Sequence, residues 1–254
     1  MTLIANEIHM YDGFEKTRLV FAADRQLSTL DGSFGTLRRK LLPIPYLNGA
    51  VSYFGLAEVF PTANRRQYLT DWLTNFIRGN AISTSLEDFA IRLRSSLHQV
   101  IPQNILKTHH SGLHIAGYNQ AGIPEFWYLS NIGGMDQFRY TNLHAQYGQP
   151  TPDFLHRDAV TLGWDGRNKH SIRNAIWTYR NGDIRAHVSA WEKLDQVLAD
   201  MLRHSDFNQI RTNDDLKRWT LFKFRFIAGL YKNFAQRSII GTPIDVICLS
   251  HNMC

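Results

Sequence analysis

The fold is decided by two stretches near the N-terminus, and the first of them runs Arg18-Leu19-Val20-Phe21-Ala22-Ala23-Asp24. It shows little alternation between apolar and polar residues, which predicts a strand that is buried on both faces. The second stretch runs Lys40-Leu41-Leu42-Pro43-Ile44 and is a further strand candidate. Each stretch carries a charged residue, Asp24 or Lys40, at the edge of a run that is predicted to be buried. Buried charges need partners, so these two residues are candidates for pairing.

Further strand candidates lie close to these two stretches. Residues 2–8 are short and rich in β-forming types, and residues 49–53 follow the second stretch after Pro45-Tyr46-Leu47-Asn48. Strands that follow one another at such short spacing favour antiparallel pairing over crossover connections. The N-terminal quarter of the chain therefore predicts an antiparallel sheet structure.

Helices and strands then alternate in pairs. The spacing of Leu69, Trp72, Leu73, Phe76 and Ile77 predicts a helix that ends at Gly79-Asn80, and a second amphipathic helix follows from residue 86. Residues 113–118 and 126–129 predict a hairpin, and residues 244–249 a closing strand. Two more helices are expected at 189–204 and from Asp214 to about Gln236. In the last, the aromatic residues at helical spacing are expected in the core: Trp219, Phe222, Phe226 and Phe234.

This order predicts an α+β fold, a four-layer αββα sandwich of two antiparallel sheets. One helix pair is expected within residues 64–101 and the other within 189–236. The two sheets are expected to meet through seven apolar residues, Val20, Phe21, Leu41, Ile44, Ile115, Val246 and Ile247. The chain is interpreted as a single domain, in which residues 131–188 are an unassigned insertion or interface segment.

Composition narrows the class of protein. The 254 residues are 44% hydrophobic and 20% charged, which is typical of a globular domain and argues against disorder. The formal net charge is +6, and the only tight basic clusters are Arg38-Arg39-Lys40 and Arg65-Arg66, which argues against nucleic-acid binding. Two cysteines exclude a disulfide scaffold. With no signal-peptide pattern and no apolar run long enough to span a bilayer, we expect a cytoplasmic protein without a membrane partner.

Thr2 offers nucleophilic chemistry. It follows the initiator Met1 and is small, so we expect Met1 to be removed. The free α-amine of Thr2, with an unperturbed pKa of about 7.7–8.0, would then lie beside its own hydroxyl and could act as its base. An Asp24–Lys40 pair next to that hydroxyl would lower the cost of forming the alkoxide. From residues alone, Thr2 also fits an ordinary chain start, and the two charges fit an ordinary surface.

Three segments together resemble the start of proteasome β-type subunits, which are N-terminal nucleophile hydrolases. They are residues 1–5, residues 19–25 and residues 39–49, and they place Thr2, Asp24 and Lys40 on the family's processed threonine, strand-end aspartate and lysine. The closing segment 238–246 resembles the ending of the bacterial proteasome-like branch called Anbu.

This resemblance implies a threonine-dependent peptide or amide hydrolase without a cofactor, which assembles as a homo-oligomeric ring. It also implies an oxyanion donor on the backbone of Phe54 or Gly55, where the family has a small Gly-rich turn, and it makes Ser238 the nearest candidate for a supporting residue.

Several alternatives stay open. A peptide ligase would pass the acyl group to an amine, and a non-catalytic ring subunit or partner-binding protein would retain Met1 over the site. His109, His110 and His114 form a weak candidate for a metal cluster, because no carboxylate or cysteine flanks them. Gly133-Gly134 lacks the lysine and the frame of a phosphate loop and is interpreted as a turn. We expect no metal site.

Overall fold

The computed structural model describes most of the chain, namely residues 2–11, 16–28, 34–62, 65–133, 135–136, 139–140, 142–151, 159–161, 174–183, 185, 190–201, 204, 210 and 212–251. Met1 and most of residues 152–173 lie outside the described part. The expected insertion at 131–188 is therefore described only in pieces. One of those pieces, β14 (Asn174–Gly182), is an inner strand of a sheet.

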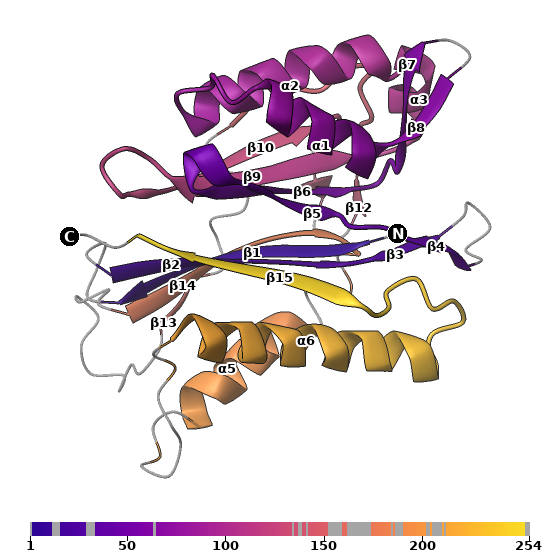
Figure 1. Ribbon diagram of the computed structural model, residues 1–254. Helices are drawn as coiled ribbons and strands as arrows, with labels where there is room; N and C mark the ends of the chain where they lie inside the picture. Colours follow the sequence, from indigo (N-terminus) through magenta and orange to yellow (C-terminus); the bar gives the residue numbers. More distant parts are fainter. Residues whose placement is uncertain are drawn as a thin grey trace.

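Two antiparallel sheets form the centre of the molecule (Figure 1). The first sheet has the order β13-β14-β1-β2-β15, with β1 at Leu3–Tyr11, β2 at Lys16–Asp24, β13 at Ala159–Thr161 and β15 at Ile244–Ser250. The second has the order β10-β9-β6-β5, with β5 at Leu41–Ile44, β6 at Gly49–Phe54, β9 at Gly112–Tyr118 and β10 at Pro124–Ser130. The α+β prediction and the 113–129 hairpin are confirmed.

Shorter elements border these sheets. Three two-stranded ribbons pair β3 (Gln26–Ser28) with β4 (Phe34–Leu37), β7 (Glu58–Thr62) with β8 (Arg65–Tyr68), and β11 (Met135–Asp136) with β12 (Arg139–Tyr140). A 3₁₀ turn, η1, spans Pro45–Leu47, and a short helix, α3, spans Gln103–Thr108. The β7–β8 ribbon occupies the start of the region that the sequence analysis assigned to the first helix pair.

Helices cover the outer face of each sheet in Figure 1. On one side lie α1 (Leu69–Gly79) and α2 (Leu86–Val100), and on the other lie α5 (Glu192–Met201) and α6 (Asn213–Phe234). The N-terminal caps explain where two of them begin: Ser85 accepts the N–H of Asp88, and Thr212 forms a capping box with Asp215. Helix α1 ends at Gly79, as the sequence predicts.

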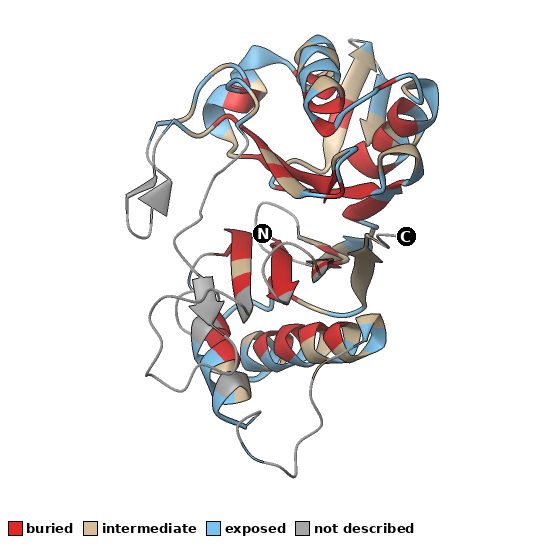
Figure 2. Cartoon of the chain, turned by 90° about the vertical axis from the view of Figure 1, so that its left-hand side faces the viewer, coloured by how far each residue is buried: buried red, intermediate tan, exposed pale blue. Residues whose placement is uncertain are grey.

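Three apolar clusters separate these layers, and Figure 2 shows the buried faces of the sheets and helices. Phe21, Leu41 and Ile247 lie in the cluster between the two sheets, as expected. Ile44 and Ile115 instead face the α1–α2 side, and Val246 faces α6. Those expectations were wrong because side chains alternate between the two faces of a strand, and a strand buried on both faces gives no sign of which residue faces which layer.

The aromatic stripe of α6 corrects another expectation. Phe222, Phe226 and Phe234 are 50%, 43% and 82% exposed and do not lie in the core. The buried face of α6 consists of other residues, Leu216, Thr220, Lys223, Phe224, Ile227 and Ala228. The aromatic spacing indicated the wrong face because apolar residues lie on both sides of this helix, and the buried side also holds a lysine and a threonine. No helix in the described ranges combines the length and hydrophobicity needed to cross a membrane.

Candidate active site

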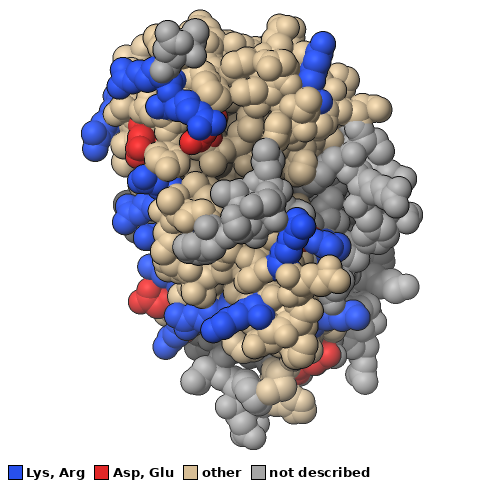
Figure 3. Space-filling view, turned by 90° about the vertical axis from the view of Figure 1, so that its right-hand side faces the viewer, with Lys and Arg blue, Asp and Glu red and all other residues tan. Residues whose placement is uncertain are grey.

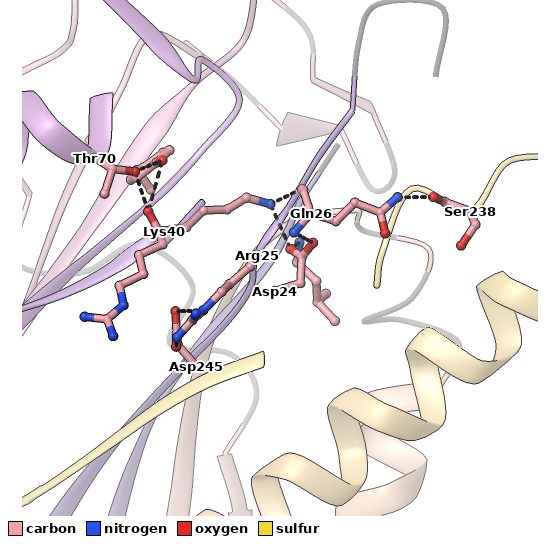
Figure 4. A network of polar contacts seen from close by, with 10 residues as sticks. Asp24, Arg25, Gln26, Lys40, Thr70, Ser238 and Asp245 are labelled. Atoms are coloured by element: carbon pink, nitrogen blue, oxygen red, sulfur yellow. Dashed lines mark hydrogen bonds and ion pairs between the residues drawn. The ribbon is translucent and has the colours of Figure 1, made fainter. Parts of the chain in front are cut away.

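Asp24 ends β2 at the point where the neighbouring strand β1 begins. Its carboxylate accepts the main-chain N–H of Leu3 at 2.8 Å and that of Gln26 at 3.2 Å. It also pairs with the Lys40 ammonium, with 3.1 Å between Oδ1 and Nζ. The side chains of both ionic partners are 0% exposed. The register of β1 against β2 thus brings the first residues of the chain to a buried ion pair. Figure 4 shows the pair itself.

Lys40 is fixed through its backbone as well as its side chain. Its carbonyl accepts the N–H of Tyr53, and the preceding carbonyl, that of Arg39, accepts hydroxyl hydrogens from Tyr53 and Thr70. The side chain then reaches across to Asp24 and to the carbonyl of Gln26, at 2.5 Å (Figure 4). An ammonium has three N–H donors, and within the described residues two acceptors engage it. One donor remains for a further acceptor.

Burial dominates the electrostatics of this pair. Loss of solvent lowers the pKa of the Lys40 ammonium, and the charge of Asp24 opposes that shift. Loss of solvent likewise raises the pKa of the Asp24 carboxyl, while Lys40 and the N–H of Leu3 oppose it. Each charge therefore depends on the other to persist inside the protein.

Thr2 precedes the residue that is bonded to the pair. The residue is 5% exposed, its carbonyl accepts the N–H of Asp183 at 3.0 Å, and its neighbour Leu3 is bonded to Asp24. Gly182 makes this approach possible: its φ is +102°, and a Cβ there would lie 1.8 Å from the Thr2 carbonyl oxygen. Thr2 is held by main-chain contacts on two sides, which leaves its hydroxyl out of these bonds.

Asp183 is a candidate that the sequence analysis missed. It is 3% exposed, and its carboxylate pairs with Arg185 at 2.7 Å. Burial alone would raise the pKa of Asp183, but bonds to Arg185 and Tyr231 hold it below its ordinary value. The sequence signal was limited to a Gly-Asp pair inside the unassigned segment 131–188, and such a pair is typical of a turn.

The other predicted residues take different places. Ser238 is exposed, and it is linked to the pair only through its carbonyl, which accepts the side-chain amide of Gln26. The side chain of Phe54 is packed between the sheets at the end of β6. Gly55, which follows, has φ of +86°, and a Cβ there would lie 2.1 Å from the carbonyl of His110. The bulky side chains of Tyr53 and Phe54 thus pack into two apolar clusters and do not occupy the site.

A metal site and a ligand pocket are two other kinds of site that a protein can carry. Within the described ranges, no three or more His, Cys, Asp or Glu side chains come together as a metal site, and His114 is buried among aromatic rings. A pocket of about 960 Å³ lies where η1, the start of α2 and the β9–β10 loop meet. None of the predicted site residues lines it.

Comparison with known proteins gives structural matches only. No family model and no curated protein sequence matches the chain. Among solved structures, an Anbu (Gly-1) mutant from Hyphomicrobium sp. strain MC1 matches with a TM-score of 0.42 and 12% identity, over 97% of this chain and 80% of that one. Eukaryotic HslV from Trypanosoma brucei matches with a TM-score of 0.43 and 12% identity, over 98% and 99%. Because both TM-scores are below 0.5, we base the functional proposal on the geometry of the site.

Proposed function

We propose that the protein is a threonine-dependent amide or peptide hydrolase of the N-terminal nucleophile type, with the four-layer αββα arrangement that this type uses. The observation that carries the proposal is the fully buried Lys40–Asp24 pair, which is bonded to the residue next to Thr2 and retains one ammonium hydrogen. A buried ion pair is costly and adds little stability by itself. Its position against the second residue of the chain supports a role in activating that residue.

The mechanism begins after removal of Met1. The Thr2 amine takes the hydroxyl proton, and Oγ attacks the carbonyl carbon of an amide. The remaining N–H of Lys40 stabilises the negative charge that develops on Oγ, and Asp24 keeps the ammonium charged and oriented. A backbone N–H of Phe54 or Gly55 receives the oxyanion. The amine then returns the proton to the leaving nitrogen, and water hydrolyses the ester on Thr2 in the same way.

Labelling by an electrophile tests this proposal. The natively expressed protein is weighed intact to establish that Met1 is absent and is then treated with a β-lactone or an epoxyketone. We expect one adduct on Thr2, no adduct on Thr2→Ala, and normal labelling of Thr108→Ala, which changes an exposed threonine on α3. Equal labelling of wild type and Thr2→Ala, with Met1 absent, would falsify the catalytic role.

A non-catalytic ring subunit or partner-binding protein is the second candidate, and the exposed apolar side chains of α6 favour it. Phe222, Phe226 and Leu230 lie one helical turn apart and are 50%, 43% and 38% exposed. Such a row fits contact with another protein chain, and a hydrolase that assembles as a homo-oligomer would use it too. We expect light scattering at micromolar concentration to give a multiple of 29.3 kDa, whereas the monomer mass would contradict assembly.

A further inference from the structure

The end of the molecule that holds the candidate site is strongly basic. In Figure 3 this side, where β3–β4 and β7–β8 lie in Figure 1, carries many more Lys and Arg than Asp and Glu side chains. Part of that charge is neutralised locally. Arg66 pairs with Glu58 at 3.2 Å, and Arg25 pairs with Asp245. Lys40 is likewise compensated by Asp24.

Three arginines on this side have no such compensation. Arg39 and Arg65 are exposed and Arg38 is partly exposed, and among the residues that the structure describes none of the three pairs with a carboxylate. Exposed cations are screened by salt, but neighbouring charges of one sign still raise the local concentration of anions. The uncompensated charge therefore favours a negatively charged ligand at this end.

Arg38 is also held in a fixed position. Its N–H donates to the carbonyl of Arg25 at 2.9 Å, and its guanidinium lies over the ring of Tyr68, 4.0 Å from the centroid. The Nε atom is buried and has no hydrogen-bond partner within the described residues. A planar guanidinium that is fixed by stacking loses little freedom when a carboxylate binds to it.

The chain places Arg38 and Arg39 next to the reacting groups. Both immediately precede Lys40, and two residues of extended chain span at most about 7 Å between Cα atoms. The Thr70 and Tyr53 hydroxyls hold the intervening carbonyl of Arg39 in place. Arg38 also lies against the strand that ends in Asp24, because its N–H donates to the carbonyl of Arg25, the residue after Asp24. The segment that carries both arginines therefore borders the candidate site.

We propose that the substrates are acidic peptides, with an Asp or Glu side chain close to the scissile amide that binds Arg38 and Arg39. This inference rests on the proposed function, because it assigns a substrate class to the same site. The carboxylate is bound and remains chemically unchanged, while the bond that breaks is the neighbouring amide. A nucleic acid would be a different ligand for the same charge and is made an outcome of the test.

The experiment uses the full chain and peptide pairs that differ only in Glu against Gln beside the cleaved bond. Turnover is measured for wild type, and binding is measured by fluorescence anisotropy with Thr2→Ala, so that the two proposals can fail separately. We expect the Glu peptide to be preferred about 5–10-fold in kcat/KM and in affinity at low salt, less at 0.5 M salt. The double variant Arg38→Gln/Arg39→Gln should lose the preference, whereas Arg92→Gln, at an exposed arginine of α2, should keep it.

The possible results distinguish failure of the proposed substrate class from failure of the proposed hydrolase activity. Preferential binding of the Glu peptide without cleavage would support the substrate class and contradict the hydrolase. Cleavage of both peptides at equal rates, or a preference that survives in the double variant, would overturn the substrate class alone. Displacement of the Glu peptide by an equimolar single-stranded oligonucleotide would also overturn it, because the basic face would then be a nucleic-acid surface.

Discussion

Two lysines are completely buried in the part of the chain that the structure describes, and their surroundings differ. Lys40 lies between the start of β5 and the end of β2, where two acceptors reach its ammonium. Lys223 lies on the inner face of α6 and pairs with both Glu7 of β1 and Asp195 of α5. Both side chains are 0% exposed, so burial alone does not distinguish them.

The surroundings of Lys223 form a closed network. Its ammonium also lies 4.4 Å from the centre of the Trp191 ring, and the indole N–H of Trp191 donates to Glu7. His9 bonds to the other oxygen of Glu7 at 2.7 Å. Two carboxylates and a ring satisfy this cation, and every partner comes from the packed interior. The network joins the first sheet to α5 and α6.

The comparison separates a buried lysine with a structural role from one whose surroundings suit catalysis. Lys223 has two anionic partners, which is the pattern of a structural link. Lys40 has one anionic partner, one carbonyl and a donor left over, beside the residue that becomes the N-terminus once Met1 is removed. A cation with a donor left over can stabilise a negative charge that develops next to it, and this is the role that we propose for Lys40 toward Thr2.

Lys223→Met should have the largest effect on stability. It leaves two buried carboxylates, Glu7 and Asp195, next to each other without a cation, so we expect the free energy of unfolding to fall by about 3–5 kcal/mol. Urea unfolding followed by circular dichroism measures this. Protein that remains folded should still be labelled at Thr2. A loss below about 1 kcal/mol would contradict the structural role of this network.

Lys40→Met should have the opposite pattern: a large loss of reactivity at Thr2 and a smaller loss of stability. Removal of one donor to a developing charge typically costs about 10²–10³ in rate, so labelling of Thr2 should slow by that factor. Only one carboxylate, that of Asp24, then lacks its cation, whereas Lys223→Met leaves two. The loss of stability should therefore be smaller than for Lys223→Met. Unchanged labelling with reduced stability would make Lys40 a second structural lysine.

Gly182→Ala tests the placement of Thr2 without touching either lysine. The added Cβ would overlap the Thr2 carbonyl oxygen, and an L residue is strained at a φ of +102°. We expect a loss of about 1–3 kcal/mol in stability and at least about tenfold slower labelling. Gly229→Ala is the matched control: it lies within α6 with no atom near the added methyl group, so it should stabilise the protein by about 0.5–1 kcal/mol.

The sequence predicted the positions of helices and strands better than it predicted which of their residues face the core. Strand and helix patterns located β2, β5, α1 and α2, because a short apolar run predicts a buried strand and apolar residues at helical spacing predict an amphipathic helix. The candidates Thr2, Asp24 and Lys40 came from the charges at strand edges together with the resemblance, and the structure brings Asp24 and Lys40 together. Whether they act as proposed stays a prediction.

Contacts between segments that are distant in the chain cannot be inferred from apolar patterns within each segment. Asp183 meets Thr2 only because β14 pairs with β1, and no spacing within either strand records that pairing. Lys223 was hidden among the aromatic residues of α6, whose larger side chains suggested that their own face was buried. A charge at an inward-facing helical position would have been the clue, since it implies partners on the neighbouring layer.

Acid should weaken the contact between Glu7 and Lys223 gradually, and this is the smallest effect that separates the two lysines. Burial alone would raise the pKa of Glu7, but the charge of Lys223 and the bond to His9 hold it well below its ordinary value. The native state therefore keeps Glu7 ionised while the unfolded chain takes up a proton below about pH 4.3. Stability from this group is present above that pH and is lost as the pH falls, by at most about 1.4 kcal/mol per pH unit.

Urea unfolding of wild type and Glu7→Gln between pH 7 and pH 3 measures this contribution. The Gln variant removes the titrating group, so its stability should fall less steeply than that of wild type below pH 5, and the difference between the two proteins should shrink toward pH 3. Asp24 should not produce this slope, because burial shifts its pKa in the opposite direction. Parallel pH profiles for wild type and Glu7→Gln would show that Lys223 does not hold Glu7 ionised. The contrast between Lys223, with two carboxylate partners, and Lys40, with one, would then have no electrostatic basis.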